Sequence, residues 1–280
     1  MKNAFLLFKE GKVVKKVLSI AGSDCSGGAG IQADLKTFSA HGIYGMSVIT
    51  SVVAENTARV ISYQNISPQI INEQMDAVFE DIFPEAVKIG MLSCEETMLA
   101  ITAGLRKWHP HNIVVDPVMY AKNGDALMEP KAINTLIESV LPSATLITPN
   151  IPEAEKIARY SISSVTDMES VGRIIYETCG TSVLIKGGHK IGEATDVLFD
   201  GKQYYYYTSE RINTKNTHGT GCTFSSAIAA QLALGKSLDQ AIQQAKQYIT
   251  TAIQHSLEIG QGHGPTNHFY SLYKNGLKEE

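Results

Sequence analysis

The chain has 280 residues, of which 44% are hydrophobic and 19% charged, a composition that suits a soluble α/β domain with a large core. The formal net charge is -4 and no basic block appears, so we expect no nucleic-acid binding. No apolar run is long enough to span a membrane, and the N-terminus lacks the pattern of a signal peptide. The four cysteines form no Cys-x-x-Cys pair, which favours reduced thiols and a cytoplasmic protein.

Strand and helix patterns alternate along most of the chain. Strands are expected at 17–21, 46–53, 60–63, 86–89, 113–115, 145–147 and 183–185, a β-hairpin at 197–207, and helices at 31–40, 67–83, 95–107, 130–140, 167–178, 222–234 and 238–255. This order predicts βαβ units and a mostly parallel sheet. Residues 1–15 show no clear period and are interpreted as an extension, either loose or a short hairpin turning at Glu10-Gly11, before one domain at 16–280.

Glycines and polar residues gather where the predicted strands end. These residues are Gly22, Glu55, Gly90, Asp116, Asn150 and Lys186. Ligands of open α/β sheets bind beyond the carboxyl ends of the strands, so we expect a binding site at this edge.

The stretch from Asn213 to Ala230 is the most informative part of the chain. It contains the glycine turn Gly219-Thr220-Gly221 and then becomes rich in Ala, Ile and Ser, as in a buried helix. The first N–H groups of a helix have no internal partners and carry partial positive charge, so such a turn binds anions, most often phosphate. A lone Gly-x-Gly is weak evidence, but the threonines, His218 and Cys222 that crowd this turn favour function. No Gly-Lys-Ser/Thr follows, which disfavours a P-loop ATPase.

Cys222 stands where this helix begins. The positive end of a helix favours the thiolate, so we expect the thiol to lose its proton more easily than usual.

Several motifs together resemble the ribokinase-like superfamily, and within it the hydroxymethylpyrimidine/phosphomethylpyrimidine kinases of thiamine biosynthesis. They read AGSDCSGGAGIQADLKTF (21–38), VAENT (53–57), KIGML (88–92), DPVM (116–119), TPNIPEA (148–154), KGGH (186–189) and NTKNTHGTGCTFSSA (213–227). The resemblance implies a sheet flanked by helices on both faces, without a separate lid domain. It also implies transfer of the γ-phosphoryl group of ATP to a pyrimidine alcohol and then to its monophosphate.

The resemblance implies a role for each matching residue. Gly219, Thr220, Gly221 and Cys222 would form the anion hole, with Cys222 as the base where most relatives have Asp. Asp116 and Glu153 would lie near Mg²⁺, and Lys186 would reach the phosphates of ATP. On the substrate side the matching residues are Gly22, Asp34, Glu55, Met91 and Val118; Asp34 would bind the hydroxymethyl group, and Met91 and Val118 would enclose the ring.

Each assignment has a structural alternative. Asp34 would be an exposed first-turn carboxylate, Lys186 a surface lysine, and Met91 and Val118 ordinary core. His189 and His218 are interpreted as hydrogen-bonding or surface residues rather than metal ligands.

Glu55 stands where the resembling kinases commonly have Gln. It could bind either the aminopyrimidine or the phenolic hydroxyl of pyridoxine. An ionised carboxylate has only acceptors, so it matches an aminopyrimidine edge only if a proton is shared. Vitamin B6 (pyridoxine/pyridoxal) kinases share most of these motifs, so such a kinase is one alternative. A non-catalytic protein that senses the pyrimidine is another, and the intact glycine turn with Asp116, Glu153 and Lys186 argues against it. A homodimer is expected from the resemblance and from the frequency of closed dimers.

Overall fold

One mixed sheet forms the centre of the molecule. The computed structural model describes residues 13–121, 124, 126–188 and 194–275. Its sheet has the strand order β3-β2-β1-β4-β5-β6-β7-β8-β9. Neighbours from β2 to β7 are parallel, whereas β3, β8 and β9 run antiparallel to their neighbours. The strands are β1 (Lys16–Asp24), β2 (Tyr44–Glu55), β3 (Val60–Asn65), β4 (Ala86–Ile89), β5 (Ile113–Val115), β6 (Leu146–Ile147), β7 (Ser182–Ile185), β8 (Ala194–Phe199) and β9 (Tyr204–Ser209).

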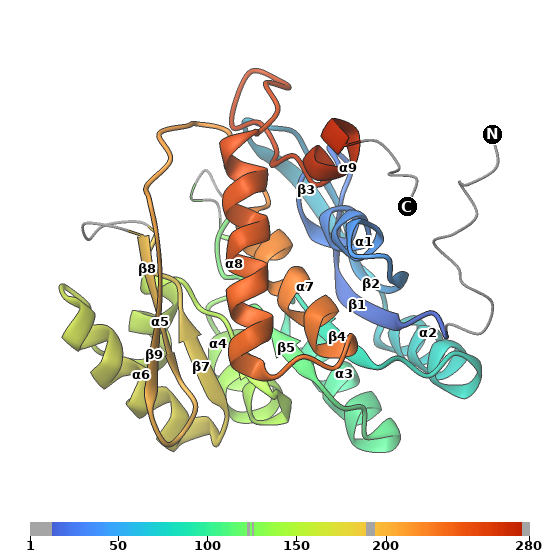
Figure 1. The fold of residues 1–280 in the computed structure, drawn as a ribbon. Helices are drawn as coiled ribbons and strands as arrows, with labels where there is room; N and C mark the ends of the chain where they lie inside the picture. Colours follow the sequence, from blue (N-terminus) through green and yellow to red (C-terminus); the bar gives the residue numbers. More distant parts are fainter. Residues whose placement is uncertain (1–12, 122–123, 125, 189–193, 276–280) are drawn as a thin grey trace.

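Helices cover both faces of this sheet (Figure 1). They are α1 (Gly30–Ala40), α2 (Pro68–Asp81), α3 (Glu95–Trp108), α4 (Ala132–Thr135), α5 (Ile151–Ala158), α6 (Val165–Cys179), α7 (Thr220–Ala233), α8 (Leu238–Gln254) and α9 (Tyr270–Asn275). Helices α1, α7 and α8 share one hydrophobic cluster with the sheet, and α2, α3, α5 and α6 share the cluster on the opposite face. The predicted fold class, a mostly parallel sheet between two helical layers, is confirmed.

Helix α7 lies between the sheet and α8 (Figure 1). Every residue from Thr223 to Ala233 is buried, so this part of the helix has no solvent-exposed face, as expected for a helix within a large core. Ala227, Ala229 and Ala230 are fully buried, and their small side chains allow close approach to the sheet. This packing brings the N-terminus of α7 to the carboxyl edge of the parallel strands.

The structure differs from the sequence prediction mainly near residue 140. The helix expected at 130–140 consists of α4, a π-helical turn (Leu136–Val140) and a 3-10 turn (Leu141–Ser143). Pro142 has no N–H to donate, so regular helix cannot continue through it. The short helix α9 was not predicted; its Tyr270 ring stacks on His255, with 3.6 Å between ring centroids.

Some predictions fall outside the described residues, namely the hairpin at Glu10-Gly11 and the role of His189. Within the described ranges, no helix is both long and apolar enough to cross a membrane. All four cysteines are free thiols; Cys94 and Cys179 are buried, and Cys25 is exposed.

Candidate active site

A cavity of about 900 Å³ opens at the carboxyl ends of the parallel strands. Every predicted site residue except Asp34 lines it: Gly22, Glu55, Met91, Asp116, Val118, Glu153, Lys186, Gly219, Thr220, Gly221 and Cys222. Its volume lies at the upper end of the range usual for small-molecule sites. The fold therefore brings together residues that are up to 200 positions apart, which the chain order alone only suggested.

The glycine turn forms the N-terminus of α7 in this cavity. Gly219 has φ +73°, a left-handed conformation, and a Cβ at this position would collide with the carbonyl oxygen of Gly28. A Cβ on Gly221 would lie 3.3 Å from Asp116 Oδ2 and 3.4 Å from Lys186 Nζ. Gly219 thus allows the left-handed turn, and Gly221 leaves space beside Lys186 in which an anion could meet the first N–H groups of the helix.

The expectation that Cys222 loses its proton easily is wrong for the ligand-free protein. Burial raises the pKa of its thiol to about 11, and the carboxylates of Asp34 and Asp116 add to the rise. The ammonium group of Lys88 opposes the shift without cancelling it. Loss of hydration therefore outweighs the partial positive charge of the helix end.

Asp116, Lys186 and Glu153 form the charged wall of the cavity. Lys186 Nζ lies 2.7 Å from Asp116 Oδ1, so Lys186 is not a free surface lysine. Glu153 is buried and closes a capping box at the start of α5, where its carboxylate accepts the N–H of Asn150 at 2.8 Å. Burial raises the pKa of Glu153 to about 7, the charge of Asp116 adds to it and Lys186 opposes it.

This donor set fits a magnesium ion. Two carboxylates lie close enough for the charge of one to shift the pKa of the other, and carboxylate oxygens are ligands that Mg²⁺ prefers. A cation between them would relieve their mutual repulsion.

Gly22 and an apolar cluster form the opposite end of the cavity. A Cβ on Gly22 would lie 2.6 Å from Ser51 Oγ and 3.3 Å from Met91 Sδ, so any larger residue would have to displace these side chains. Met91 packs with Val53 and Leu127, and Val118 lies against this cluster. Flat apolar surface beside bare backbone suits a small aromatic ring.

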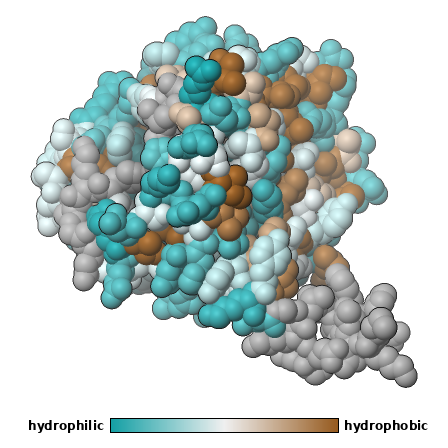
Figure 2. Space-filling view, turned by 90° about the horizontal axis from the view of Figure 1, so that it is seen from above, coloured by the Kyte–Doolittle hydropathy of each residue, from teal (hydrophilic) through white to brown (hydrophobic). Residues whose placement is uncertain are grey.

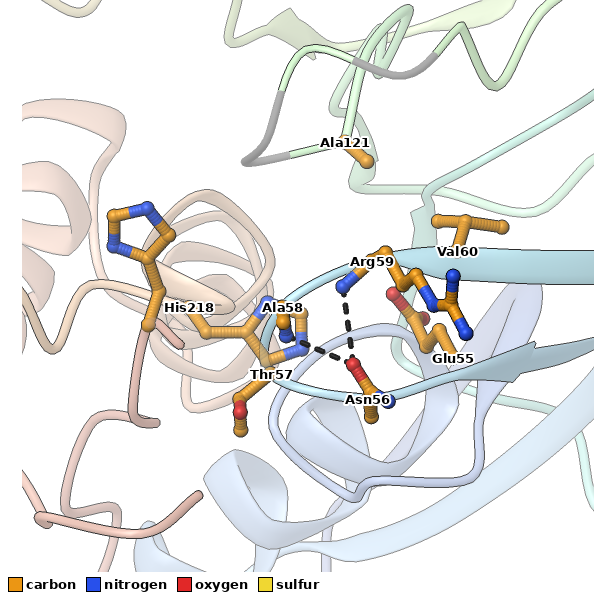
Figure 3. A pocket seen from close by; sticks show the side chains of 9 residues that line it. Glu55, Asn56, Thr57, Ala58, Arg59, Val60, Ala121 and His218 are labelled. Carbon is orange, nitrogen blue, oxygen red and sulfur yellow. Dashed lines mark hydrogen bonds between the residues drawn. The ribbon is translucent and has the colours of Figure 1, made fainter. Parts of the chain in front are cut away.

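Glu55 ends β2 at the same end of the cavity. Burial raises the pKa of its carboxyl to about 7, and the negative charge of Asp24 adds to the rise. Figure 3 shows Glu55 beside Arg59, close to the β2–β3 turn, where Asn56 accepts the N–H groups of Ala58 and Arg59. Because its pKa is about 7, the Glu55 carboxyl is partly protonated and partly ionised at neutral pH.

Asp34 does not line the cavity. It is fully buried, and its carboxylate accepts hydrogen bonds from Ser19 Oγ at 2.6 Å, Ser226 Oγ at 2.7 Å and Lys88 Nζ at 2.9 Å. The alternative of an exposed first-turn carboxylate is also wrong. Asp34 instead pairs with the buried ammonium group of Lys88, which lies 54 residues away in the sequence.

The sequence prediction missed two pairs in the cavity wall. His218 Nε2 lies 2.8 Å from Asp24 Oδ2, which confirms the hydrogen-bonding role expected for His218. Both belong to motifs quoted above, but their contact spans 194 positions and gave no local signal. At the other end, Lys246 Nζ lies 2.6 Å from Asp196 Oδ2, and no motif marked these residues.

Asp24, Glu55 and His218 together are a poor metal site. One ligand atom from each lies within 4.8 Å of the others. The carboxylate of Asp24, however, already accepts the N–H groups of Ser26, Gly28 and Ala29 in addition to the His218 ring. A metal ion would have to displace these donors.

A glycine turn at a helix N-terminus, a lysine and two carboxylates around one cavity define a phosphotransferase of the α/β class. The comparisons with known proteins narrow the class. Residues 24–267 match the family model described as phosphomethylpyrimidine kinase, and the chain belongs to that family. It is therefore a kinase, with ATP as the implied phosphoryl donor.

Curated relatives cover nearly the whole chain. The hydroxymethylpyrimidine/phosphomethylpyrimidine kinase of Rhizobium meliloti is 51% identical over 92% of this chain and 98% of its own length. A thiamine biosynthesis bifunctional protein of Geobacter sulfurreducens is 49% identical over 90% of the chain, and the chain spans 52% of that longer protein.

Solved structures agree with the fold. Pyridoxal kinase of Bacillus subtilis, in an ADP complex, is 38% identical with a TM-score of 0.85, covering 92% of this chain and 98% of that one. Phosphomethylpyrimidine kinase of Clostridium difficile is 50% identical with a TM-score of 0.78, covering 85% of this chain and 99% of that one.

Proposed function

We propose that the protein phosphorylates 4-amino-5-hydroxymethyl-2-methylpyrimidine, and then its monophosphate, with ATP in thiamine biosynthesis. The observation that carries the proposal is one cavity that joins an apolar end, lined by Val53, Met91 and Leu127, to the α7 turn and Lys186. The names of the relatives support the substrate. A coupled assay for ADP release, with the pyrimidine alcohol and with pyridoxal, tests it.

Each wall of the cavity has a part in the proposed reaction. The N–H groups of Gly219 to Cys222 bind the transferring phosphoryl group, and Lys186 binds the phosphates of ATP as a point charge. Asp116 and Glu153 would hold Mg²⁺, which would supply positive charge against the negative charge of the phosphoryl oxygens. Gly22, Met91 and Val118 hold the ring, and Glu55 reads its polar edge.

Cys222 receives the proton of the substrate alcohol in this scheme. Its raised pKa means that most of the thiol is protonated at neutral pH before reaction. The transition state of phosphoryl transfer is loose and needs the base only late, so a small thiolate fraction suffices.

Vitamin B6 is the second candidate substrate, because a solved pyridoxal kinase shares the fold over nearly the whole chain. In that case Glu55 would accept a hydrogen bond from the phenolic hydroxyl of pyridoxine. Faster ADP release with pyridoxal than with the pyrimidine would favour this reading. Release with neither alcohol would favour the non-catalytic sensor.

We also propose a cytoplasmic homodimer built from one kinase domain at 16–280. Support for an interface comes from exposed apolar residues on β2 and the edge strand β3, among them Val52, Ile61 and Tyr63. Seen from above, hydrophobic residues are more frequent on the right side of the molecule than on the left (Figure 2). A monomer mass by light scattering at micromolar concentration would contradict the dimer.

A further inference from the structure

The carboxylate of Asp24 organises the loop between β1 and α1. It accepts the N–H groups of Ser26 at 2.7 Å, Gly28 at 2.9 Å and Ala29 at 2.7 Å. Burial alone would raise the pKa of Asp24, but the hydrogen bonds from His218 and Ser26 hold it well below its usual range. Asp24 is therefore a fixed anion whose fourth donor comes from a distant loop.

That fourth donor is the ring of His218, directly before the α7 turn. Its Nε2 lies 2.8 Å from Asp24 Oδ2, and both side chains are nearly closed to solvent. The backbone N–H of His218 donates to the carbonyl of Gly264 at 3.1 Å. His218 is thus held from two sides, by Asp24 and by the segment that follows α8.

The two loops touch at positions that only glycine can occupy. A Cβ on Gly28 would collide with the His218 ring, and a Cβ on Gly219 would collide with the carbonyl of Gly28. The backbone amide of Gly30 also lies close enough to the thiol of Cys222 to lower its pKa. The Asp24–His218 bond therefore lies at the centre of the contact between the β1–α1 loop and the α7 turn.

We propose that Asp24 and His218 are positioning residues for phosphoryl transfer, whose hydrogen bond keeps the N–H groups of the α7 turn in place relative to the substrate. The proposal rests on the proposed function of this turn as the anion hole. Such positions are sensitive, because a shift of about 1 Å in a reacting group costs about 10²-fold in rate. Neither side chain has to touch the transferring group.

The test compares His218→Ala, His218→Gln and Asp24→Asn with the wild-type protein. In His218→Gln the side-chain amide N–H can replace the ring Nε2–H as donor to Asp24. In Asp24→Asn the side-chain amide has one acceptor fewer, and its NH₂ group faces N–H donors of the loop. The control is His41→Ala, at the C-terminal end of α1. It also removes a partly buried imidazole ring that makes a hydrogen bond, here from Nδ1 to Thr37 O at 2.8 Å. It lies outside the cavity and should keep full activity.

We expect His218→Ala and Asp24→Asn to lower kcat by about 10²-fold while KM for both substrates changes by less than about threefold. His218→Gln should recover at least about tenfold of that loss. Amide hydrogen exchange in the peptides covering 24–32 and 213–230 should be faster in His218→Ala and Asp24→Asn than in the wild type. In His218→Gln the exchange rate should return toward the wild-type value.

Several outcomes would overturn the proposal. They are a folded His218→Ala with wild-type kcat, unchanged exchange in both peptides, or a Gln variant as impaired as Ala. If His218→Ala does not fold, His218→Gln against Asp24→Asn decides, because the proposal requires the first to be the more active. The exchange comparison needs no substrate, so it separates failure of this proposal from failure of the proposed function.

Discussion

Lys88 Nζ lies 2.9 Å from each carboxylate oxygen of Asp34, and neither side chain is exposed to solvent. Burial alone would lower the pKa of Lys88, but the negative charges of Asp34, Cys222 and Asp116, together with the hydrogen bond to Asp34, raise it above its usual value. The pair joins β4 to α1, and Ser19 and Ser226 attach it to β1 and α7. Ser226 stands one helical turn beyond Cys222 on α7, and neither Asp34 nor Lys88 lines the cavity.

Removing one partner of this pair should destabilise the fold strongly. We expect Asp34→Asn or Lys88→Met alone to lower the free energy of unfolding by about 3–5 kcal/mol, because each leaves an uncompensated or misfitted buried group. The double variant Asp34→Asn/Lys88→Met should lose less free energy of unfolding than the two single variants added together. Urea unfolding followed by fluorescence of Trp108, the single tryptophan, measures this, and additive losses would contradict the pairing.

Substitution of Cys222 should separate catalysis from nucleotide binding. Cys222→Ala leaves the backbone N–H groups in place, so nucleotide affinity by calorimetry should persist while transfer falls by about 10²–10⁴-fold. Cys222→Asp should retain activity. Wild-type turnover in Cys222→Ala would show that the thiol is not the base.

The pH dependence of kcat tests the same thiol. With a pKa of about 11, the thiolate fraction grows about tenfold per pH unit below that value. We therefore expect kcat at saturating substrates to rise between pH 8 and 9.5 in the wild type, and not in Cys222→Asp. A flat wild-type profile over that range would contradict thiolate as the base.

Glu55 should make pyrimidine binding weaker at high pH. Because burial and Asp24 raise its pKa to about 7, the carboxyl carries a proton below neutral pH and can donate it to a ring nitrogen. Above pH 7 it ionises, and KM for the pyrimidine should rise by up to about tenfold per pH unit. Glu55→Gln should flatten this dependence. A pH-independent wild-type KM, or a preference for pyridoxine, would contradict the assignment.

Asp116 and Glu153 should control the requirement for magnesium. If they hold the ion through water, Asp116→Asn and Glu153→Gln should each raise the Mg²⁺ concentration for half-maximal rate by about 10–100-fold, and chelation should abolish the wild-type rate. The control is Asp167→Asn, a half-buried capping carboxylate at the start of α6 that does not line the cavity. An unchanged requirement in both site variants would remove these residues from the metal site.

Most strands and helices could be predicted because their signals are local. The strand before Gly22 and the buried helix after Gly221 follow from runs of a few residues. The edge of the sheet that carries the site also follows, because parallel strands place their carboxyl ends together. The helix near residue 140 could not be placed correctly, since a single proline alters its last turns.

The sequence by itself determined which edge of the sheet carries the cavity, since strand direction and the glycine turn are local properties. Only the tertiary structure decided what surrounds each ionisable group. Asp34 was expected to face the substrate, but Lys88 occupies its carboxylate. Cys222 was expected to ionise readily, but burial raises its pKa. Asp24 meets His218 across 194 positions. Burial and long-range pairing dominate these charges because loss of water and nearby opposite charge are stronger than any signal from sequence neighbours.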